Sequence, residues 1–158
     1  MSVGRTTRQN IALLCFYPSR AMEQRVFDAV TEAGFDDITP AQARVFSRLD
    51  PEGTRVSELA ERALVTKQTA TFMVDQLERA GYVTRAVDPT DGRARIVRIA
   101  ERGRQAVAVA RQVEQQVEAE WAEHLGSRRT RQLREALESL REITDPYAED
   151  VGKGTHRR

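Results

Sequence analysis

One stretch of the chain, from Tyr82 to Ile99, has the pattern of a β-hairpin, whereas most of the sequence before and after it has helical patterns. The runs Tyr82–Val87 and Arg95–Ile99 are rich in residues that favour strands. The segment Asp88–Ala94 between them contains proline, aspartate and glycine, which are turn residues. The sequence therefore predicts a mainly α-helical fold with one small β-hairpin.

Apolar residues recur at helical spacing in the segment that precedes the hairpin. A first helix is expected from about residue 6 to residue 34, kinked at Pro18 and ended by Gly34. A second helix, a turn at residues 50–53 and a short strand at residues 54–56 should follow. Two short helices come next, and Gly81 should end the second of them. The expected amino-terminal caps of these three later helices are Thr39, Ser57 and Thr66.

The last third of the chain has two further amphipathic stripes, one over about residues 101–124 and one that ends at Pro146. Together with the first helix, they offer more apolar surface than one small domain can bury. A two-fold homodimer is therefore expected; the alternative is a monomeric helical bundle. The residues expected to face the partner include Ala110, Val113, Val117, Leu133, Leu137 and Leu140.

The length, net charge and cysteine count exclude several classes of protein. The chain has 158 residues, a net charge of +1 and a single cysteine, Cys15. One thiol forms neither an intrachain disulfide nor a cysteine zinc cluster, and we expect no metal and no cofactor. No apolar run approaches the ~18 residues of a membrane span, and no signal-peptide pattern is found. A cytoplasmic protein with no membrane partner is expected.

The sequence also lacks the parts of an enzyme. It has two histidines, His124 near a helix end and His156 in the tail. No phosphate-binding glycine loop, paired histidine ligands or nucleophile motif is found. We therefore expect a protein that is not an enzyme.

Positive charge is concentrated in the middle of the chain. Residues 62–98 contain seven basic and four acidic side chains, a surplus of three positive charges. Residues 103–149 contain seven basic and nine acidic side chains. Because the net charge is small, binding to a polyanion would depend on this local patch.

The order of elements in the middle of the chain is that of a winged helix-turn-helix: a short helix, a tight turn, a second helix with a polar first half, and a basic hairpin. The major groove of duplex DNA admits one helix, whose first residues meet the base edges. A hairpin beside that helix can reach the minor groove, where arginine is attracted. Arg93, at the turn, is best placed to enter, and Arg95 can reach phosphate. The residues suited to meet base edges are Lys67, Gln68, Thr69 and Thr71.

Several of these residues have a simpler interpretation. Thr66 is expected mainly as a helix cap that can also contact phosphate. Phe72 is either a half-buried core residue or part of the DNA-binding surface. Arg98 is expected to be a solvated surface residue, and Asp91 could form a surface ion pair with Arg93.

This layout predicts one domain over residues 1–158. Its winged helix-turn-helix lobe spans residues 36–100, and dimerisation helices lie at residues 6–34 and 101–146. The polar, basic tail at residues 147–158 is expected to be disordered.

Two motifs resemble the MarR family, the multiple antibiotic resistance regulators, within residues 39–103. They are "LVTKQTATFMVDQLERAGYV", at Leu64–Val83, and "DPTDGRARIVRIAERG", at Asp88–Gly103. Asp91 and Arg93 match the family's Asp-x-Arg, in which the aspartate orients an arginine in the minor groove. The sequence departs from the family at Ile99-Ala100, where Leu-Thr is usual, and at Phe72, where many members carry arginine or another polar residue.

The resemblance implies a homodimeric transcription regulator, usually a repressor, that binds pseudo-palindromic duplex DNA. Such proteins often release the DNA when a small, commonly aromatic, ligand binds. An architectural DNA-binding protein without an effector is a further alternative.

Cys15 raises a second possibility for regulation. "LLCFYPSRAM", at residues 13–22, resembles the first helix of the organic-hydroperoxide-sensing branch of the same family. The simpler interpretation is a small buried side chain on the stripe of Ile11 and Leu14, and we expect burial to slow oxidation of the thiol.

Overall fold

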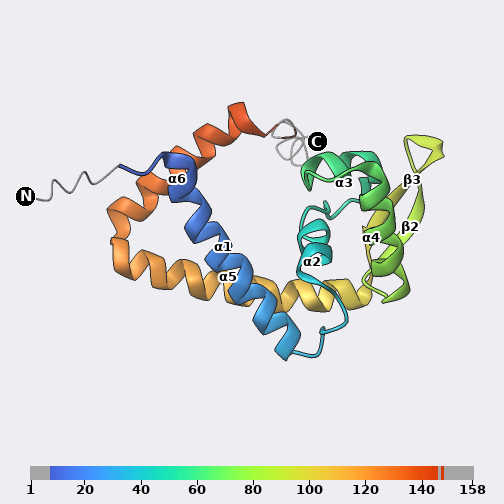
Figure 1. Ribbon diagram of the computed structural model, residues 1–158, viewed down its shortest axis with the longest axis horizontal. Coiled ribbons are helices and arrows are strands. Elements are labelled where there is room, and N and C mark those ends of the chain that lie inside the picture. Colours follow the sequence, from blue (N-terminus) through green and yellow to red (C-terminus); the bar gives the residue numbers. More distant parts are fainter. Residues whose placement is uncertain (1–7, 146, 148–158) are drawn as a thin grey trace, which may run out of the picture. The chain divides into compact units, whose positions relative to one another are not determined.

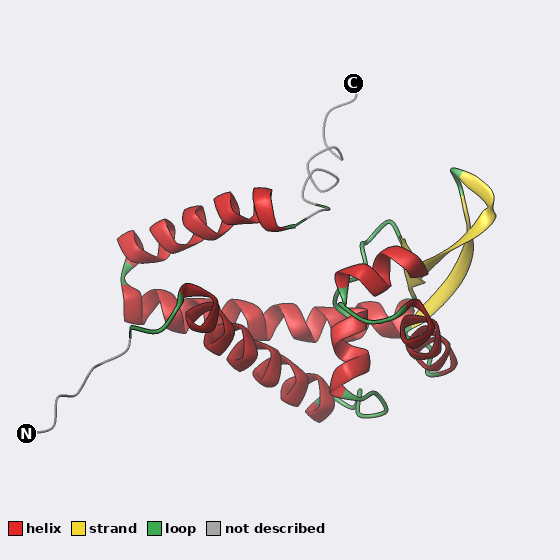
Figure 2. Cartoon of the chain, turned by 45° about the horizontal axis from the view of Figure 1, so that its top comes forward, coloured by secondary structure: helices red, strands yellow, loops and turns green. Residues whose placement is uncertain are grey.

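The computed structural model describes residues 8–145 and residue 147; the other residues, which include most of the expected tail, lie outside the description. The described chain forms six helices and a small antiparallel sheet, so the predicted mainly α-helical fold is confirmed (Figures 1 and 2). In chain order the elements are α1 (Ile11–Glu32), α2 (Pro40–Phe46), β1 (Thr54–Arg55), α3 (Val56–Arg62), α4 (Lys67–Arg79), β2 (Val83–Asp88), β3 (Asp91–Ile99), α5 (Glu101–Leu125) and α6 (Ser127–Thr144). One compact unit ends at Glu114 and a second begins at Gln115, so α5 contributes residues to both.

Side-chain caps set the starts of three helices. The Asn10 side chain accepts a hydrogen bond of 2.8 Å from the N–H of Leu13, so α1 begins at residue 11 rather than near residue 6. The helix continues through Pro18, and the prediction of a single helix there is confirmed. The predicted caps Thr39 and Thr66 are also confirmed, at α2 and α4.

Helices α1, α3 and α4 end in the same way. The residue after each C-cap has a positive φ, which is +95° at Gly34, +54° at Leu64 and +82° at Gly81. The next N–H bonds to the carbonyl five residues before it, as Val65 does to Ala60. Glycine takes this conformation easily, so the endings at Gly34 and Gly81 agree with prediction. Leu64 takes it without that freedom, and its side chain is 92% exposed.

The sheet has the strand order β1-β3-β2, and both pairings are antiparallel. Val83 pairs with Ile99, and Thr54 pairs with Val97. Strand β3 begins at Asp91, so the turn between β2 and β3 is shorter than the expected segment 88–94. Arg93 consequently lies on the strand and not in the turn, which corrects the prediction. We call the β2–β3 hairpin the wing.

Near its turn, the wing is tied to β1 by a group that we call the wing-turn cluster, made of Arg55, Asp88 and Thr90. One Asp88 carboxylate oxygen accepts hydrogen bonds from the N–H and the hydroxyl of Thr90, at 2.8 and 2.7 Å. The other accepts from Arg55 Nε at 2.7 Å and forms an ion pair of 2.6 Å with Nη2. Strand β1 runs directly into α3, so Arg55 also occupies the N-cap position of that helix.

The prediction that Ser57 caps α3 is wrong. The helix begins one residue before it, at Val56, and its N-cap residue makes no side-chain cap hydrogen bond. The short strand pairing with β3 determines where the chain turns into the helix, and this pairing is not visible in the local sequence.

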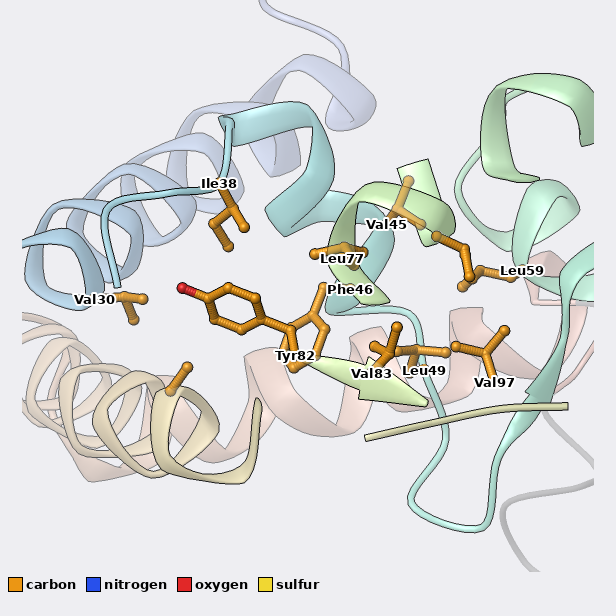
Figure 3. Close-up of a cluster of buried hydrophobic side chains, with 12 residues drawn as sticks. Val30, Ile38, Val45, Phe46, Leu49, Leu59, Leu77, Tyr82, Val83 and Val97 are labelled. Carbon is orange, nitrogen blue, oxygen red and sulfur yellow. The ribbon is translucent and has the colours of Figure 1, made fainter. Parts of the chain in front are cut away.

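The core of the first unit is apolar and lies between the helix-turn-helix, the sheet and the start of α5. Figure 3 shows the Tyr82 ring among these side chains, with its hydroxyl between Val30 and Ile38. Gly103 is required beside it, because a Cβ at this position would lie 2.3 Å from the carbonyl oxygen of Tyr82. Completely or almost completely buried members of the core are Val45, Leu59, Val74, Leu77, Tyr82, Val83 and Val97.

The hydroxyl of Tyr82 connects three segments. It donates to Asp37 Oδ1 at 2.6 Å, and Arg102 donates to both oxygens of the same carboxylate, at 2.7 and 2.9 Å. The Arg102 guanidinium carbon lies 4.6 Å from the centroid of the Tyr82 ring. Burial and the neighbouring carboxylate raise the pKa of Tyr82 above its usual value, so the hydroxyl keeps its proton.

The second unit contains the end of α5 and all of α6, joined at Gly126, whose φ is +79°. Arg134 on α6 donates to Glu118 on α5 at 2.7 Å. Helix α6 has no buried residue. Its apolar stripe remains exposed in the single chain, at 48% for Leu133, 43% for Leu137 and 43% for Leu140.

Asp88→Asn should destabilise the protein in a pH-dependent way. Hydrogen bonds from Thr90, and then from Arg55, lower the pKa of Asp88 to about 2, against about 3.9 in an unfolded chain. Because the folded value is the lower one, the stabilisation is fully present above about pH 4 and is lost as the pH falls towards 2. The difference in unfolding free energy between wild type and Asp88→Asn should therefore shrink over that interval.

Chemical denaturation at a series of pH values, at one protein concentration, measures this difference. Glu52→Gln, which changes an exposed carboxylate in the turn before β1, is the control and should keep a constant difference from wild type. A gap between wild type and Asp88→Asn that stays the same from pH 7 to pH 2 would contradict the role given to the wing-turn cluster.

Candidate nucleic-acid interface

Helix α4 buries one side and exposes the other. Ala70, Val74 and Leu77 on its inner side are at most 1% exposed, as the predicted apolar stripe requires. On the outer side, Gln68 and Phe72 are both exposed and lie one helical turn apart. The first half of α4 therefore presents a continuous surface to solvent.

The predicted base-contacting residues lie on this surface or beside it. Thr66, Lys67, Gln68 and Thr71 are exposed, and Thr69 is half-buried. Phe72 is 60% exposed, so its interpretation as a core residue is wrong.

The threonine hydroxyls of this surface are engaged within the helix. Thr66 Oγ1 accepts from the N–H of Thr69 at 3.1 Å and shares a hydrogen bond of 2.8 Å with the Thr69 hydroxyl. Thr71 Oγ1 donates to the carbonyl oxygen of Lys67 at 2.8 Å. Within the described part of the chain, the ammonium of Lys67 and the side-chain amide of Gln68 have no partner. They are the polar groups available to a ligand.

The acidic residues of α4 are held by an arginine from the sheet. Arg85 on β2 pairs with both Asp75 and Glu78, and its N–H donates to Glu78 at 3.1 Å. These ion pairs offset negative charge that would otherwise repel a polyanion. The sequence shows the charges of these residues, but their pairing across α4 and β2 was not predicted from it.

The arginines of β3 are placed differently from Arg85. Arg93, Arg95 and Arg98 are all exposed, and their guanidinium groups form no ion pair with any residue in the described ranges. Because successive side chains of a strand point to opposite faces, Arg93 and Arg95 share one face and Arg98 lies on the other. The first two therefore form one cationic strip along the wing.

Asp91 controls the backbone of Arg93 and not its side chain. Asp91 Oδ1 accepts a hydrogen bond of 3.1 Å from the N–H of Arg93. Its other oxygen lies 3.9 Å from Nη2 of Arg55. The surface ion pair between Asp91 and Arg93, which the sequence left open as an alternative, is absent, so the Arg93 guanidinium is available to a ligand.

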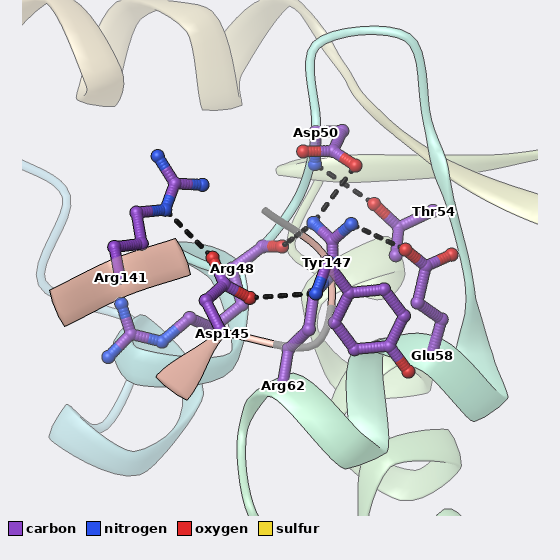
Figure 4. Close-up of polar contacts among 8 residues, drawn as sticks. All are labelled: Arg48, Asp50, Thr54, Glu58, Arg62, Arg141, Asp145 and Tyr147. Atoms are coloured by element: carbon purple, nitrogen blue, oxygen red, sulfur yellow. Dashed lines mark hydrogen bonds and ion pairs between the residues drawn. The ribbon is translucent and has the colours of Figure 1, made fainter. Parts of the chain in front are cut away.

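Arg62 on α3 is a further arginine that stabilises the helix-turn-helix. Figure 4 shows Arg62 of α3 between Asp50 and Glu58, which it contacts at 2.9 and 2.5 Å. It also donates to the carbonyl oxygen of Arg48, at 3.5 Å. This basic residue is thus occupied by structural contacts, and the available charge belongs to α4 and the wing.

Cys15 does not lie in a buried stripe. In the single chain it is exposed, and its neighbours Ile11 and Leu14 are 71% and 50% exposed. The expected burial of this thiol is therefore wrong for the single chain, because the apolar stripe of α1 is not covered there.

Other kinds of site receive little support in the described residues. They contain no cluster of three or more His, Cys, Asp or Glu side chains that could hold a metal ion. Among them, no helix has both the length and the apolar character needed to cross a membrane. A shallow depression of about 410 Å³ at the α5–α6 turn is lined by Leu125, Gly126, Ser127, Arg128, Arg129 and Gln132.

Comparisons with known proteins agree with this geometry. Residues 36–94 match the model of the MarR family. The exopolysaccharide II synthesis transcriptional activator ExpG of Rhizobium meliloti (strain 1021) is 32% identical over 83 residues. These residues are 52% of this chain and 43% of ExpG, so the match spans less than half of that relative.

Solved structures share the fold over most of the chain. Transcriptional regulator PA4135 has a TM-score of 0.65 and 25% identity, over 86% of this chain and 98% of its own. The MarR family protein RV2887 of Mycobacterium tuberculosis, in complex with p-aminosalicylic acid, has a TM-score of 0.60 and 23% identity, over 84% and 98%. The family match covers the helix-turn-helix and most of the wing, and the fold extends the likeness to the flanking helices. Residues 36–94 therefore resemble the MarR family of transcription regulators, and the fold of the chain is that of solved transcription regulators.

Proposed function

We propose that this protein regulates transcription by binding duplex DNA, with the first half of α4 in the major groove and the wing in the adjacent minor groove. The observation that supports this most is the division between occupied and available charges. Asp75, Glu78 and Asp88 are each paired with an arginine, whereas the cations of Lys67 and of β3 face solvent. Figure 1 shows α4 beside the wing strands.

Each group has a role that suits its chemistry. Lys67 and Gln68 supply hydrogen-bond donors to base edges or phosphates. Arg93 is suited to the minor groove, where the negative potential is strongest if the groove is narrow. Arg95, on the same face, reaches phosphate, and Thr66 contacts phosphate beside its cap.

We further propose that two copies of the chain form a homodimer that reads a pseudo-palindromic operator. In the first unit, α1 exposes Ile11, Leu14, Phe16 and Tyr17, by about half or more of each side chain. In the second unit, α6 exposes its whole apolar stripe. A second copy of the chain would remove both surfaces from water, where burial is worth about 25 cal/mol per Å².

We also propose the direction of regulation and the signal that changes DNA binding. We propose a cytoplasmic repressor, without catalytic activity, that a small aromatic molecule releases from DNA. The complex of RV2887 with p-aminosalicylic acid supports such a ligand, while the name of ExpG, an activator, supports the opposite sign of regulation. Because Cys15 is exposed on α1, a thiol switch is the second candidate.

Removal of the Arg93 side chain should weaken DNA binding. Arg93→Ala should cost about 1–3 kcal/mol of binding free energy on an operator selected in vitro from random duplexes. Arg98→Ala removes the same charge from the opposite face of β3 and is the matched control, with a smaller effect. Fluorescence anisotropy at several salt concentrations measures both. Equal losses in the two variants would show that charge alone, and not entry of the wing, determines affinity.

The homodimer depends on the apolar stripe of α6. Leu137→Asp should dissociate the dimer, because it places an unpaired charge in an apolar interface. Ser139→Asp adds the same charge to the other side of α6 and should leave the dimer intact. Sedimentation equilibrium distinguishes these outcomes, and a monomeric wild type at micromolar concentration would exclude the homodimer.

The two triggers can be separated on the assembled DNA complex. Aromatic acids should release the DNA from both wild type and Cys15→Ser, because the proposed effector does not use the thiol. Dilute organic hydroperoxide should release neither. Release by hydroperoxide that is seen in wild type and lost in Cys15→Ser would replace the effector with a redox switch.

A further inference from the structure

Phe72 is a large apolar side chain exposed at the centre of the surface proposed to bind DNA. It is 60% exposed, while Met73 and Val74 beside it take the inner positions of α4. The ring contacts of the described residues do not include it. Core packing therefore does not explain a phenylalanine at this position.

The neighbours of Phe72 have few hydrogen-bond donors to offer. The proton of the Thr71 hydroxyl is already donated to the carbonyl oxygen of Lys67, and a hydroxyl has only one donor. The Thr66–Thr69 pair uses one of its two hydroxyl protons internally. On the next turn of α4, Asp75 is paired with Arg85. Apart from Gln68, most of the polar side chains around Phe72 are thus satisfied within the protein.

The position of Phe72 relative to Gln68 matches the spacing of bases. Four residues of α-helix rise about 6 Å, and successive base pairs are about 3.4 Å apart. When Gln68 contacts one base edge, Phe72 lies one to two base pairs away, still within the major groove. Gln68 supplies a polar contact and Phe72 an apolar one.

The major groove contains one apolar group that distinguishes bases, which is the C5 methyl of thymine. We propose that Phe72 determines specificity by packing against a thymine methyl in each half-site of the operator, so that α4 reads this base by burial of apolar surface and not by hydrogen bonds. This inference rests on the proposed binding of duplex DNA and adds to it the chemistry of the base that is selected. The same contact accepts 5-methylcytosine, which carries its methyl at the same position.

The test uses deoxyuridine, which pairs as thymidine does but lacks the methyl group. Each thymine of the selected operator is replaced in turn, and the affinity of the full-length protein is measured. One thymine per half-site should show a loss of about three- to tenfold, the effect expected when about one methyl group is buried. Phe72→Ala should lose a similar factor on the thymine operator and bind the thymine and uracil operators equally.

Two controls make the result specific to Phe72. Gln68→Ala should weaken binding but keep the uracil penalty at the same position. An operator with cytosine at that position should bind better when the cytosine is 5-methylated, in wild type and not in Phe72→Ala. Because Phe72 is exposed, its replacement should leave the circular dichroism spectrum and the dimer unchanged.

Failure of the thymine contact can be distinguished from failure of the proposed DNA binding. A wild-type protein that selects no duplex would overturn the proposed function itself. A wild type that binds its operator but tolerates uracil at every position would overturn the thymine contact alone, as would a penalty that persists in Phe72→Ala. A Phe72→Ala variant that binds DNA as wild type does but loses self-association would assign this side chain to a protein interface instead.

Discussion

The hydroxyl of Tyr82 is the contact on which the arrangement of the DNA-binding lobe depends. The residue follows the end of α4 directly, and its ring is completely buried in the core. Burial of a phenol hydroxyl without a partner would be costly, and Asp37 supplies that partner. The same carboxylate binds Arg102, so the segment after α1, the exit of α4 and the start of α5 meet at one point. Gly103 allows α5 to come this close.

The distribution of charge in the lobe follows a consistent pattern. Two arginines of the lobe are paired with carboxylates: Arg62 with Asp50 and Glu58, and Arg85 with Asp75 and Glu78. The arginines of β3, in contrast, have no acidic partner in the described chain. Acidic side chains near the DNA-facing surface are therefore neutralised, while the net charge of the whole protein stays near zero. A nearly neutral chain can in this way present a locally cationic surface.

The features that the sequence predicted correctly are those decided by nearby residues. Thr66 and Gly81 mark the ends of α4 through local hydrogen bonds and a single backbone angle, so a short stretch of sequence contains the signal. The apolar side of α4 was also predictable, because a period of 3.6 residues is visible in the sequence. The order of helix-turn-helix and hairpin then followed from these elements.

The features that were missed depend on distant partners. Ser57 has the residue type of a cap, but the pairing of β1 with β3 sets the start of α3. The wing-turn cluster joins Arg55 to Asp88 across 33 positions, and the sequence predicted only the turn beside it. Cys15 lies on a real apolar stripe, yet it is exposed among the residues that the structure describes. A hydrophobic pattern shows that a surface is suited to burial, but it does not show which segment or chain buries it.

Arg55 has a consequence for how the lobe meets its ligand. It lies at the start of α3, the first helix of the helix-turn-helix, and holds Asp88 beside the turn of the wing, so the helix-turn-helix and the wing share one attachment. The distance between the helix-turn-helix and the wing is then set by the protein. In the proposed complex, DNA that fits this spacing poorly would bend, twist or change the width of its minor groove. Half-sites with easily deformed pyrimidine–purine steps between the two contacts gain an advantage that no side chain reads directly.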